Sequence, residues 1–162
     1  ETGAASISEA TKWLADGGLV GIFPESTISR SFELAEFKTG AARIAHEAGV
    51  PMIPTVIWGS QRILTKDLKK NLGRSKTPVF VSYGEPIWAT GNAEEDTRRV
   101  KDAMQAQLEE LREKYAEQYG PFKDGLDWMP ASLGGSAPTL EEANQILERE
   151  RAAKKAAREA RK

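Results

Sequence analysis

The stretch 19–58 reads LVGIFPESTISRSFELAEFKTGAARIAHEAGVPMIPTVIW and decides the predicted fold. Leu19–Phe23 is a short apolar run followed by proline, which is typical of a buried strand. A helix is predicted over Thr39–Gly49, because alanines recur in it and a proline follows its end. Met52–Trp58 is the next apolar run, and Pro54 within it indicates an edge or distorted strand. Strand, helix and strand make a βαβ unit, so we predict an α/β fold with a mostly parallel sheet flanked by helices.

Further elements are predicted on both sides of this unit. Ser6 and Glu9 form a capping signal for a first helix, which should stop at Gly17-Gly18. Val79–Tyr83 is a third strand candidate. Beyond it, a long amphipathic helix is predicted to begin after a capping signal and to end at Gly120-Pro121. Its capping residues are Asn92 and Glu95, and its apolar stripe is Val100, Met104, Leu108, Leu111 and Tyr115.

The remaining part of the chain changes in composition. After residue 120 the sequence becomes rich in glycine, proline and isolated aromatic residues, which predicts an irregular connector. Thr139 and Glu142 then cap a final helix whose apolar residues run out quickly, leaving alanines and charges. We therefore predict one domain over residues 1–120, and a connector with a charged helical tail over residues 121–162.

Composition narrows the classes of function. Of the 162 residues, 40% are hydrophobic and 29% charged, with a net charge of −1, which is typical of a globular protein without a general affinity for nucleic acid. The absence of cysteine and the single histidine argue against a metal site. No apolar run reaches the roughly 20 residues needed to span a bilayer, and no secretory signal is evident. We expect a cytoplasmic protein, with contact to a membrane surface left open.

A candidate anion site follows the first predicted strand. Glu25 stands where open α/β sheets place their ligand sites, and Pro24 restricts the backbone there. The start of the next helix suits a phosphate, to which Arg30 would add a bidentate fork and Lys38 a point charge, while Gly40 allows close approach. The alternative is that these cations and Arg43 are solvated charges paired with nearby acids, namely Glu33, Glu36 or Glu47.

Other polar residues offer weaker signals. Ser26 and Thr27 lack a base at a meaningful spacing, so turn and cap hydrogen bonds are expected of them. His46 is followed five positions later by Pro51, and we expect it to be structural. A basic run between two predicted strands could meet anionic lipid headgroups or an acidic acyl carrier protein, or could be a solvated face. This run consists of Lys66, Lys69, Lys70, Arg74 and Lys76.

Three blocks in order resemble the 1-acylglycerol-3-phosphate acyltransferase family. Phe23-Pro24-Glu25 is similar to the start of its Phe-Pro-Glu-Gly-Thr-Arg block, with Ser26 in place of glycine and Ile28 in place of arginine. Phe37–Ala41 matches the Phe-Lys-x-Gly-Ala block, and Val50–Pro54 matches Val-Pro-x-x-Pro. The run Ser29–Leu34 is similar to the actinobacterial-type branch. The resemblance covers residues 4–86 and implies the C-terminal half of the domain, truncated at its amino terminus.

The resemblance implies transfer of a fatty acyl group from acyl-CoA or acyl carrier protein to a lysophosphatidic acid-type acceptor in phospholipid biosynthesis. The acceptor's phosphate would be held by Glu25, Ser26, Thr27, Arg30, Lys38 and Gly40. Catalysis in the family uses an upstream His-x-x-x-x-Asp dyad, which these 162 residues do not contain. We therefore expect no catalytic residue, metal or cofactor here, and no activity from the chain alone. Its expected place is the cytoplasm, with peripheral contact at the inner membrane face. The alternative is a non-catalytic half-domain that binds lipid phosphate or a partner.

Overall fold

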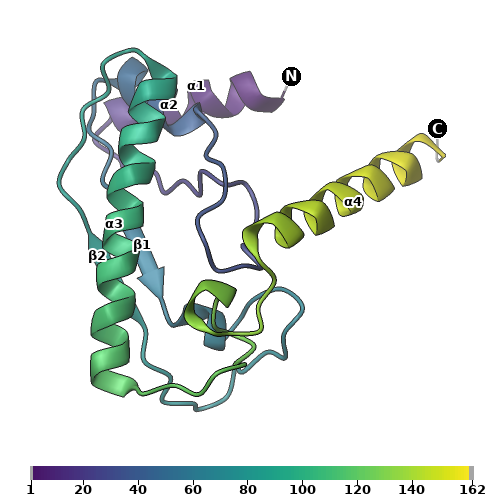
Figure 1. The fold of residues 1–162 in the computed structure, drawn as a ribbon. Coiled ribbons are helices and arrows are strands. Elements are labelled where there is room, and N and C mark those ends of the chain that lie inside the picture. The colour runs from purple at the N-terminus through teal and green to yellow at the C-terminus, as the bar shows by residue number, and fades with distance from the viewer. Residues whose placement is uncertain (1, 161–162) are drawn as a thin grey trace.

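Helix α3 (Ala93–Tyr119) runs the length of the molecule, and both strands and one shorter helix pack directly against it. The computed structural model describes residues 2–160. Figure 1 shows α1 and α2 at one end of α3 and a two-stranded hairpin along its middle. In the same view α4 projects from the middle of the molecule towards the right. The elements are α1 (Thr2–Ala15), α2 (Gly40–Ala48), β1 (Thr55–Trp58), β2 (Phe80–Tyr83), α3 and α4 (Leu140–Glu159), with 3-10 turns at Ser60–Arg62 and Ala131–Leu133.

The sheet differs from the prediction of a mostly parallel sheet. β1 and β2 pair antiparallel, with Thr55 opposite Tyr83 and Trp58 opposite Phe80. Within residues 2–160 no parallel pair of strands is formed. β1 begins just after Pro54, whose carbonyl accepts a hydrogen bond from the Gly84 amide at 2.8 Å. The prediction that proline disturbs this run is confirmed, because the regular strand begins only at Thr55 and Met52, before the proline, pairs with Ile87 as an isolated antiparallel bridge.

The strand predicted over Leu19–Phe23 is wrong. The segment is irregular, and Leu19 and Phe23 are 87% and 82% exposed. An apolar run becomes a buried strand only where a neighbouring strand hydrogen-bonds to it, and among residues 2–160 no strand pairs with this segment. Without it the βαβ unit reduces to α2 followed by β1.

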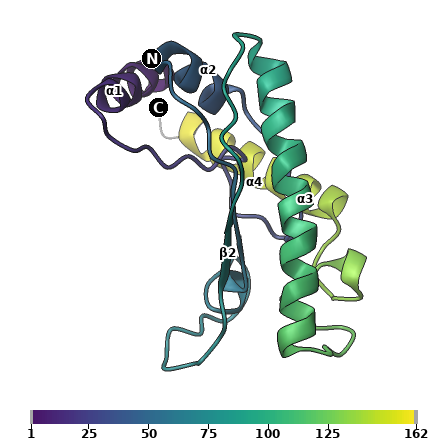
Figure 2. The same cartoon turned by 90° about the vertical axis from the view of Figure 1, so that its left-hand side faces the viewer.

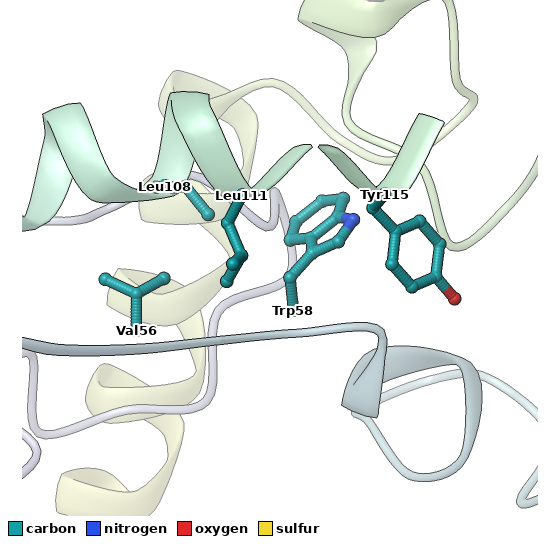
Figure 3. Close-up of a cluster of buried hydrophobic side chains, with 5 residues drawn as sticks. All are labelled: Val56, Trp58, Leu108, Leu111 and Tyr115. Carbon is teal, nitrogen blue, oxygen red and sulfur yellow. The ribbon is translucent and has the colours of Figure 1, made fainter. Parts of the chain in front are cut away.

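The hydrophobic core lies between β1 and α3. Val56 and Trp58 point from the strand towards Leu108, Leu111 and Tyr115 of the helix (Figure 3). The C-terminal part of the predicted apolar stripe of α3, Leu108 to Tyr115, therefore forms the helical side of the core. Because side chains alternate along a strand, Ile57 points to the opposite face and is 46% exposed.

The helix ends follow the sequence signals closely, with one exception. The Asn92 side chain accepts a hydrogen bond from the Glu95 amide at the start of α3. Thr139 and Glu142 form a reciprocal capping box at the start of α4. α1 begins at Thr2, before the predicted cap at Ser6, and ends before Gly17 as expected. The connector over residues 121–139 is irregular apart from one 3-10 turn, whereas the division into two units at residue 120 stays a prediction.

Candidate functional site

The loop 24–38, called here the acidic-motif loop, closes upon itself directly before α2. The Lys38 amide donates to the Pro24 carbonyl at 3.0 Å, so the two ends of the loop meet. The Ser26 amide donates to the Phe23 carbonyl at 3.2 Å and forms the turn that opens the loop. Ser26 and Phe32 adopt positive φ angles of 54° and 59°. Such angles are uncommon for residues other than glycine, so the loop holds a specific shape.

Helix α3 binds the middle of this loop, at Phe32 and Glu33. Arg112 Nη2 donates to the Phe32 carbonyl at 2.6 Å and to Glu33 Oε2 at 3.0 Å. The same guanidinium lies 4.6 Å from the centre of the Trp58 ring, so it links the loop to the core. Glu33 and Glu36, the partners considered for the loop cations, pair instead with Arg112 and Lys101 of α3.

Glu25 holds the loop together from inside. Its Oε2 accepts a hydrogen bond from the Ala35 amide at 2.9 Å. Burial raises the pKa of the Glu25 carboxyl, while the Ala35 hydrogen bond and the charge of Lys101 partly offset that rise. The side chain is half-buried. Glu25 thus positions the loop backbone at Ala35, and its predicted contact with a phosphate ligand stays a prediction.

Ser26 and Thr27 follow Glu25 on the outer side of the turn. Ser26 is exposed at the tip, and the Thr27 hydroxyl reaches only the adjacent Ile28 carbonyl, at 3.5 Å. No histidine accompanies either hydroxyl in the described part of the chain. The expectation that they serve the turn agrees with their place in it, and their contact with a phosphate stays a prediction.

Arg30 is buried and already surrounded by carboxylates. Its Nε donates to Asp67 Oδ2, and its Nη2 donates to Glu150 Oε1 of α4 at 2.5 Å. These hydrogen bonds, to Asp67 first and then to Glu150, raise the pKa of the Arg30 guanidinium. The same contact with Arg30 lowers the pKa of both carboxyls. A phosphate would have to displace a carboxylate to reach this fork.

Lys38 and Gly40 flank the first turn of α2 and remain accessible. Within residues 2–160 the exposed Lys38 side chain forms no ion pair. Thr39 precedes the helix without capping it through its side chain, and no acid lies in the first turn. A Cβ added at Gly40 would meet nothing within 4 Å, so the space beside this backbone is open. These features leave the helix start free to face an anion.

A small hollow separates the acidic-motif loop from α4. Of the six predicted phosphate-binding residues, Thr27 and Arg30 line it. The opposite wall belongs to α4, and the sequence analysis gave no reason to place that helix here. The capping box at Thr139 could show where the helix starts, but only the Glu150–Arg30 contact shows where it lies. Lining residues from α4 are Leu140, Ala143, Asn144 and Leu147.

The single histidine lies outside this hollow. His46 is exposed on α2 and packs beside Gly91, where it borders a second hollow with Glu47 and Asp96. Asp96 is fully buried; burial acts to raise its pKa, but hydrogen bonds from Thr90, Gly91 and Arg99 outweigh burial and lower it. Among residues 2–160, no group of three or more acidic or histidine side chains could hold a metal ion. None of the helices described there has the length and apolar character to cross a bilayer.

Comparison with known proteins gives the class to which this fold and loop belong. The Acyltransferase family model matches residues 1–58. A probable 1-acyl-sn-glycerol-3-phosphate acyltransferase of Mycoplasma pneumoniae is 26% identical over 120 residues, which are 70% of this chain and 44% of that protein. The 1-acyl-sn-glycerol-3-phosphate acyltransferase of Haemophilus influenzae is 34% identical over 101 residues, covering 59% of this chain and 40% of that protein.

A solved structure agrees with the sequence relatives. The 1-acyl-sn-glycerophosphate (LPA) acyltransferase PlsC from Thermotoga maritima shares 31% identity and a TM-score of 0.55, over 65% of this chain and 44% of that one. Over these ranges the chain is similar to 1-acyl-sn-glycerol-3-phosphate acyltransferases, as its three sequence blocks indicated. It spans less than half the length of these relatives.

Proposed function

We propose that this chain forms the acceptor-phosphate side of an O-acyltransferase of phospholipid biosynthesis. The enzyme would move a fatty acyl group from acyl-CoA or acyl carrier protein to a lysophosphatidic acid-type acceptor. One observation carries this proposal: two of the resemblance blocks lie at the two ends of one closed loop, directly before an uncapped helix start. The Lys38 amide and the Pro24 carbonyl make that closure.

Within this site the residues divide into two roles. Lys38 and the first turn of α2, with Gly40, would contact the phosphate, because their charge and backbone donors are free to meet it. Glu25 would shape the loop through its hydrogen bond to the Ala35 amide. Arg30 would join the phosphate contacts only after exchanging Glu150 for the ligand, since its Nη2 already donates to that carboxylate. Ser26 and Thr27 would add hydroxyl donors at the turn.

The chemical step would need a base that these 162 residues do not supply. In the proposed reaction the acceptor hydroxyl loses its proton to a histidine, its oxygen attacks the thioester carbonyl, and the thiolate leaves and takes up a proton. His46 is exposed on α2, and the residue five positions after it is Pro51 and not aspartate, so His46 does not begin such a dyad. We therefore infer that the chain alone does not catalyse transfer, and that no metal or cofactor takes part.

A second candidate function does not require a dyad. The chain would then be a non-catalytic half-domain that binds lipid phosphate or a partner through the same loop. Both candidates share phosphate recognition, so direct binding tests what they have in common. We propose further that the chain is cytoplasmic and works peripherally at the inner face of the membrane, where its acceptor resides.

A chimera tests the enzymatic proposal. The amino-terminal part of the Haemophilus influenzae relative is joined before this chain, and thiol release from acyl-CoA is followed with lysophosphatidic acid present or absent. This chain has no cysteine and so adds no thiol background. We expect acceptor-dependent release, with Glu25→Ala, Arg30→Ala and Lys38→Ala each raising KM or lowering kcat. Lys12→Ala, an exposed change on α1, is the matched control.

Binding by the chain as it stands tests phosphate recognition, and turnover by the chimera then separates the two candidates. Lysophosphatidic acid should bind more tightly than the monoacylglycerol that lacks its phosphate, and Lys38→Ala should remove the difference. Binding without turnover in the chimera would favour the non-catalytic half-domain. Parent-like behaviour of all three loop variants in both assays would show that the acidic-motif loop does not hold the phosphate.

A further inference from the structure

The loop that joins β1 to β2 carries a strong local positive charge. Residues 59–79, called here the β1–β2 loop, contain six lysines and arginines and one acid, Asp67. That acid is held by Arg30 of the acidic-motif loop. By contrast, α4 carries five basic and five acidic residues, so its charges balance. In a chain whose net charge is −1, the β1–β2 loop is the surface that attracts anions.

Exposed leucines accompany these cations. Leu64 and Leu72 are 54% and 68% exposed. The Asn71 amide donates to the Ile63 carbonyl at 2.8 Å. Because Ile63 precedes Leu64 and Asn71 precedes Leu72, this hydrogen bond brings the backbone segments that carry the two leucines side by side. Four exposed cations lie close to Leu72 in the sequence and form no ion pair among the residues that the structure describes: Lys69, Lys70, Arg74 and Lys76.

The loop has an ordered base and a projecting end. Tyr115 of α3 donates its hydroxyl to the Pro78 carbonyl at 3.1 Å and accepts from Arg62 Nη1 at 2.7 Å. A side chain at Gly59 would collide with that same carbonyl, so only glycine lets the two ends of the loop meet this closely. Figure 2 shows the loop reaching beyond the end of the hairpin, away from α1 and α2. Cations and leucines are therefore presented at one end of the molecule.

We propose that the β1–β2 loop docks this chain on an anionic phospholipid bilayer. Leu64 and Leu72 enter the boundary between headgroups and acyl chains, and the four cations contact lipid phosphates around them. This combination of apolar insertion and surrounding positive charge is the arrangement by which peripheral segments bind anionic membranes. An acidic protein would be attracted by the charge, but it gives no reason for two adjacent leucines to face water.

The docking surface is coupled to the candidate phosphate site by Asp67. That residue belongs to the β1–β2 loop, yet its carboxylate binds Arg30. A bilayer bound to the β1–β2 loop therefore lies close to the acidic-motif loop, which is proposed to receive the lipid acceptor. The inference deepens and rests on the proposed function, because it names the surface by which the chain meets the acceptor's membrane.

Vesicle flotation with the 162-residue chain tests the proposal without acyl transfer. The chain is mixed with vesicles of phosphatidylcholine alone or with added phosphatidylglycerol. We expect binding to the anionic vesicles that weakens as salt is raised. The double variant Lys69→Ala/Lys70→Ala should lower the partition coefficient about 30-fold, from the attraction that each cation adds at an anionic surface. Leu72→Ser should lower it about tenfold through lost apolar insertion.

A second cationic pair provides the matched control. Lys154→Ala/Lys155→Ala removes the same charge from exposed positions on α4 and should leave binding unchanged. Equal loss from both double variants would overturn the proposal, since general charge would then explain binding. It would also be overturned by absent vesicle binding together with a salt-sensitive complex with purified acyl carrier protein. Failure here leaves thiol release by the chimera unaffected when the acceptor is supplied in detergent, so the two proposals fail separately.

Discussion

Arg30 and Glu150 lie 120 residues apart in sequence and are joined at 2.5 Å in the structure. The contact connects the acidic-motif loop to α4, which otherwise projects from the molecule (Figure 1). Asp67 completes the cluster from the β1–β2 loop. Three segments that are distant in sequence therefore meet on one guanidinium.

Replacing Glu150 should loosen α4 selectively. We expect Glu150→Gln to increase amide hydrogen exchange several-fold in α4 and in the acidic-motif loop, because the charge-assisted bond to Arg30 is weakened. Hydrogen exchange read by mass spectrometry on peptides from both segments measures this. Glu148→Gln, an exposed change on the same helix, should leave exchange as in the parent.

The contact should also depend on pH. Arg30 lowers the pKa of Glu150 below its ordinary value of 4.5 and that of Asp67 below 3.8. A carboxyl whose pKa is lowered on folding stabilises the fold above the ordinary value, and this contribution is lost as pH falls through the lowered value. The protection of α4 amides, measured relative to their intrinsic exchange rate at each pH, should thus fall in acid for the parent and change less for Glu150→Gln. Identical acid profiles would show that this pair does not hold α4 in place.

The contribution of Glu25 to stability should depend on pH in the opposite direction to that of Glu150. Its pKa is raised by burial, so the folded protein binds this proton more tightly than the unfolded chain, and ionisation costs stability at neutral pH. Glu25→Gln keeps an acceptor for the Ala35 amide and removes the charge. We expect Glu25→Gln to equal or exceed the parent in unfolding free energy at pH 7, with the difference vanishing as pH falls towards 4.5.

Glu25→Ala separates the hydrogen bond from the charge. It leaves the Ala35 amide without its partner, and we expect a loss of about 1–3 kcal/mol in unfolding free energy. Urea denaturation of the parent and both variants at several pH values gives the comparison. If Glu25→Ala matched Glu25→Gln at every pH, the carboxylate would have no part in shaping the loop.

Local signals in the sequence predicted the local structure well. The caps at Asn92 and Thr139 and the stripe ending at Tyr115 are confirmed, because capping and helical periodicity depend on residues a few positions apart. The strand at Leu19–Phe23 failed because its formation depends on a neighbour elsewhere in space. Hydrophobicity alone cannot show whether that neighbour is present.

In the candidate site, too, local features were predicted from the sequence, and contacts between distant segments were not. The helix start directly after the acidic-motif loop was predicted from the sequence, and the blocks at the two ends of the loop also indicated the family resemblance, whereas the closure between Lys38 and Pro24 is seen only in the structure. The carboxylates around Arg30 were not predicted, because Asp67 and Glu150 come from segments with no motif that points to this loop. Their effect is to make Arg30 compete for its ligand, which no spacing along the chain could indicate.

Tyr115 should prove to be the anchor of the β1–β2 loop. Tyr115→Phe keeps the buried ring and removes the hydroxyl that binds the Pro78 carbonyl and Arg62. We expect a loss of about 1–3 kcal/mol in unfolding free energy, together with faster exchange in the loop. Tyr119→Phe is the control, since the Tyr119 hydroxyl makes no hydrogen bond in the described part of the chain and its ring is more exposed. Equal effects of the two variants would assign the loss to ring packing.

The same substitution, an aliphatic side chain to threonine, should change the unfolding free energy on one face of β1 and hardly at all on the other. Val56 is buried against α3, whereas Ile57 points away and lies opposite Val81 on the uncovered face (Figure 3 shows the buried side). Val56→Thr buries a hydroxyl and should cost about 1–3 kcal/mol. Ile57→Thr should change the unfolding free energy by less than about 0.5 kcal/mol.

The outer face should instead govern dye binding and self-association. An uncovered apolar sheet face binds an apolar dye and promotes association of copies. Ile57→Thr with Val81→Thr should therefore reduce fluorescence of anilinonaphthalene sulfonate and shift sedimentation towards monomer, while Val56→Thr should not. Weak dye binding by a parent chain that sediments as a monomer and unfolds cooperatively would mean that this face is closed in solution.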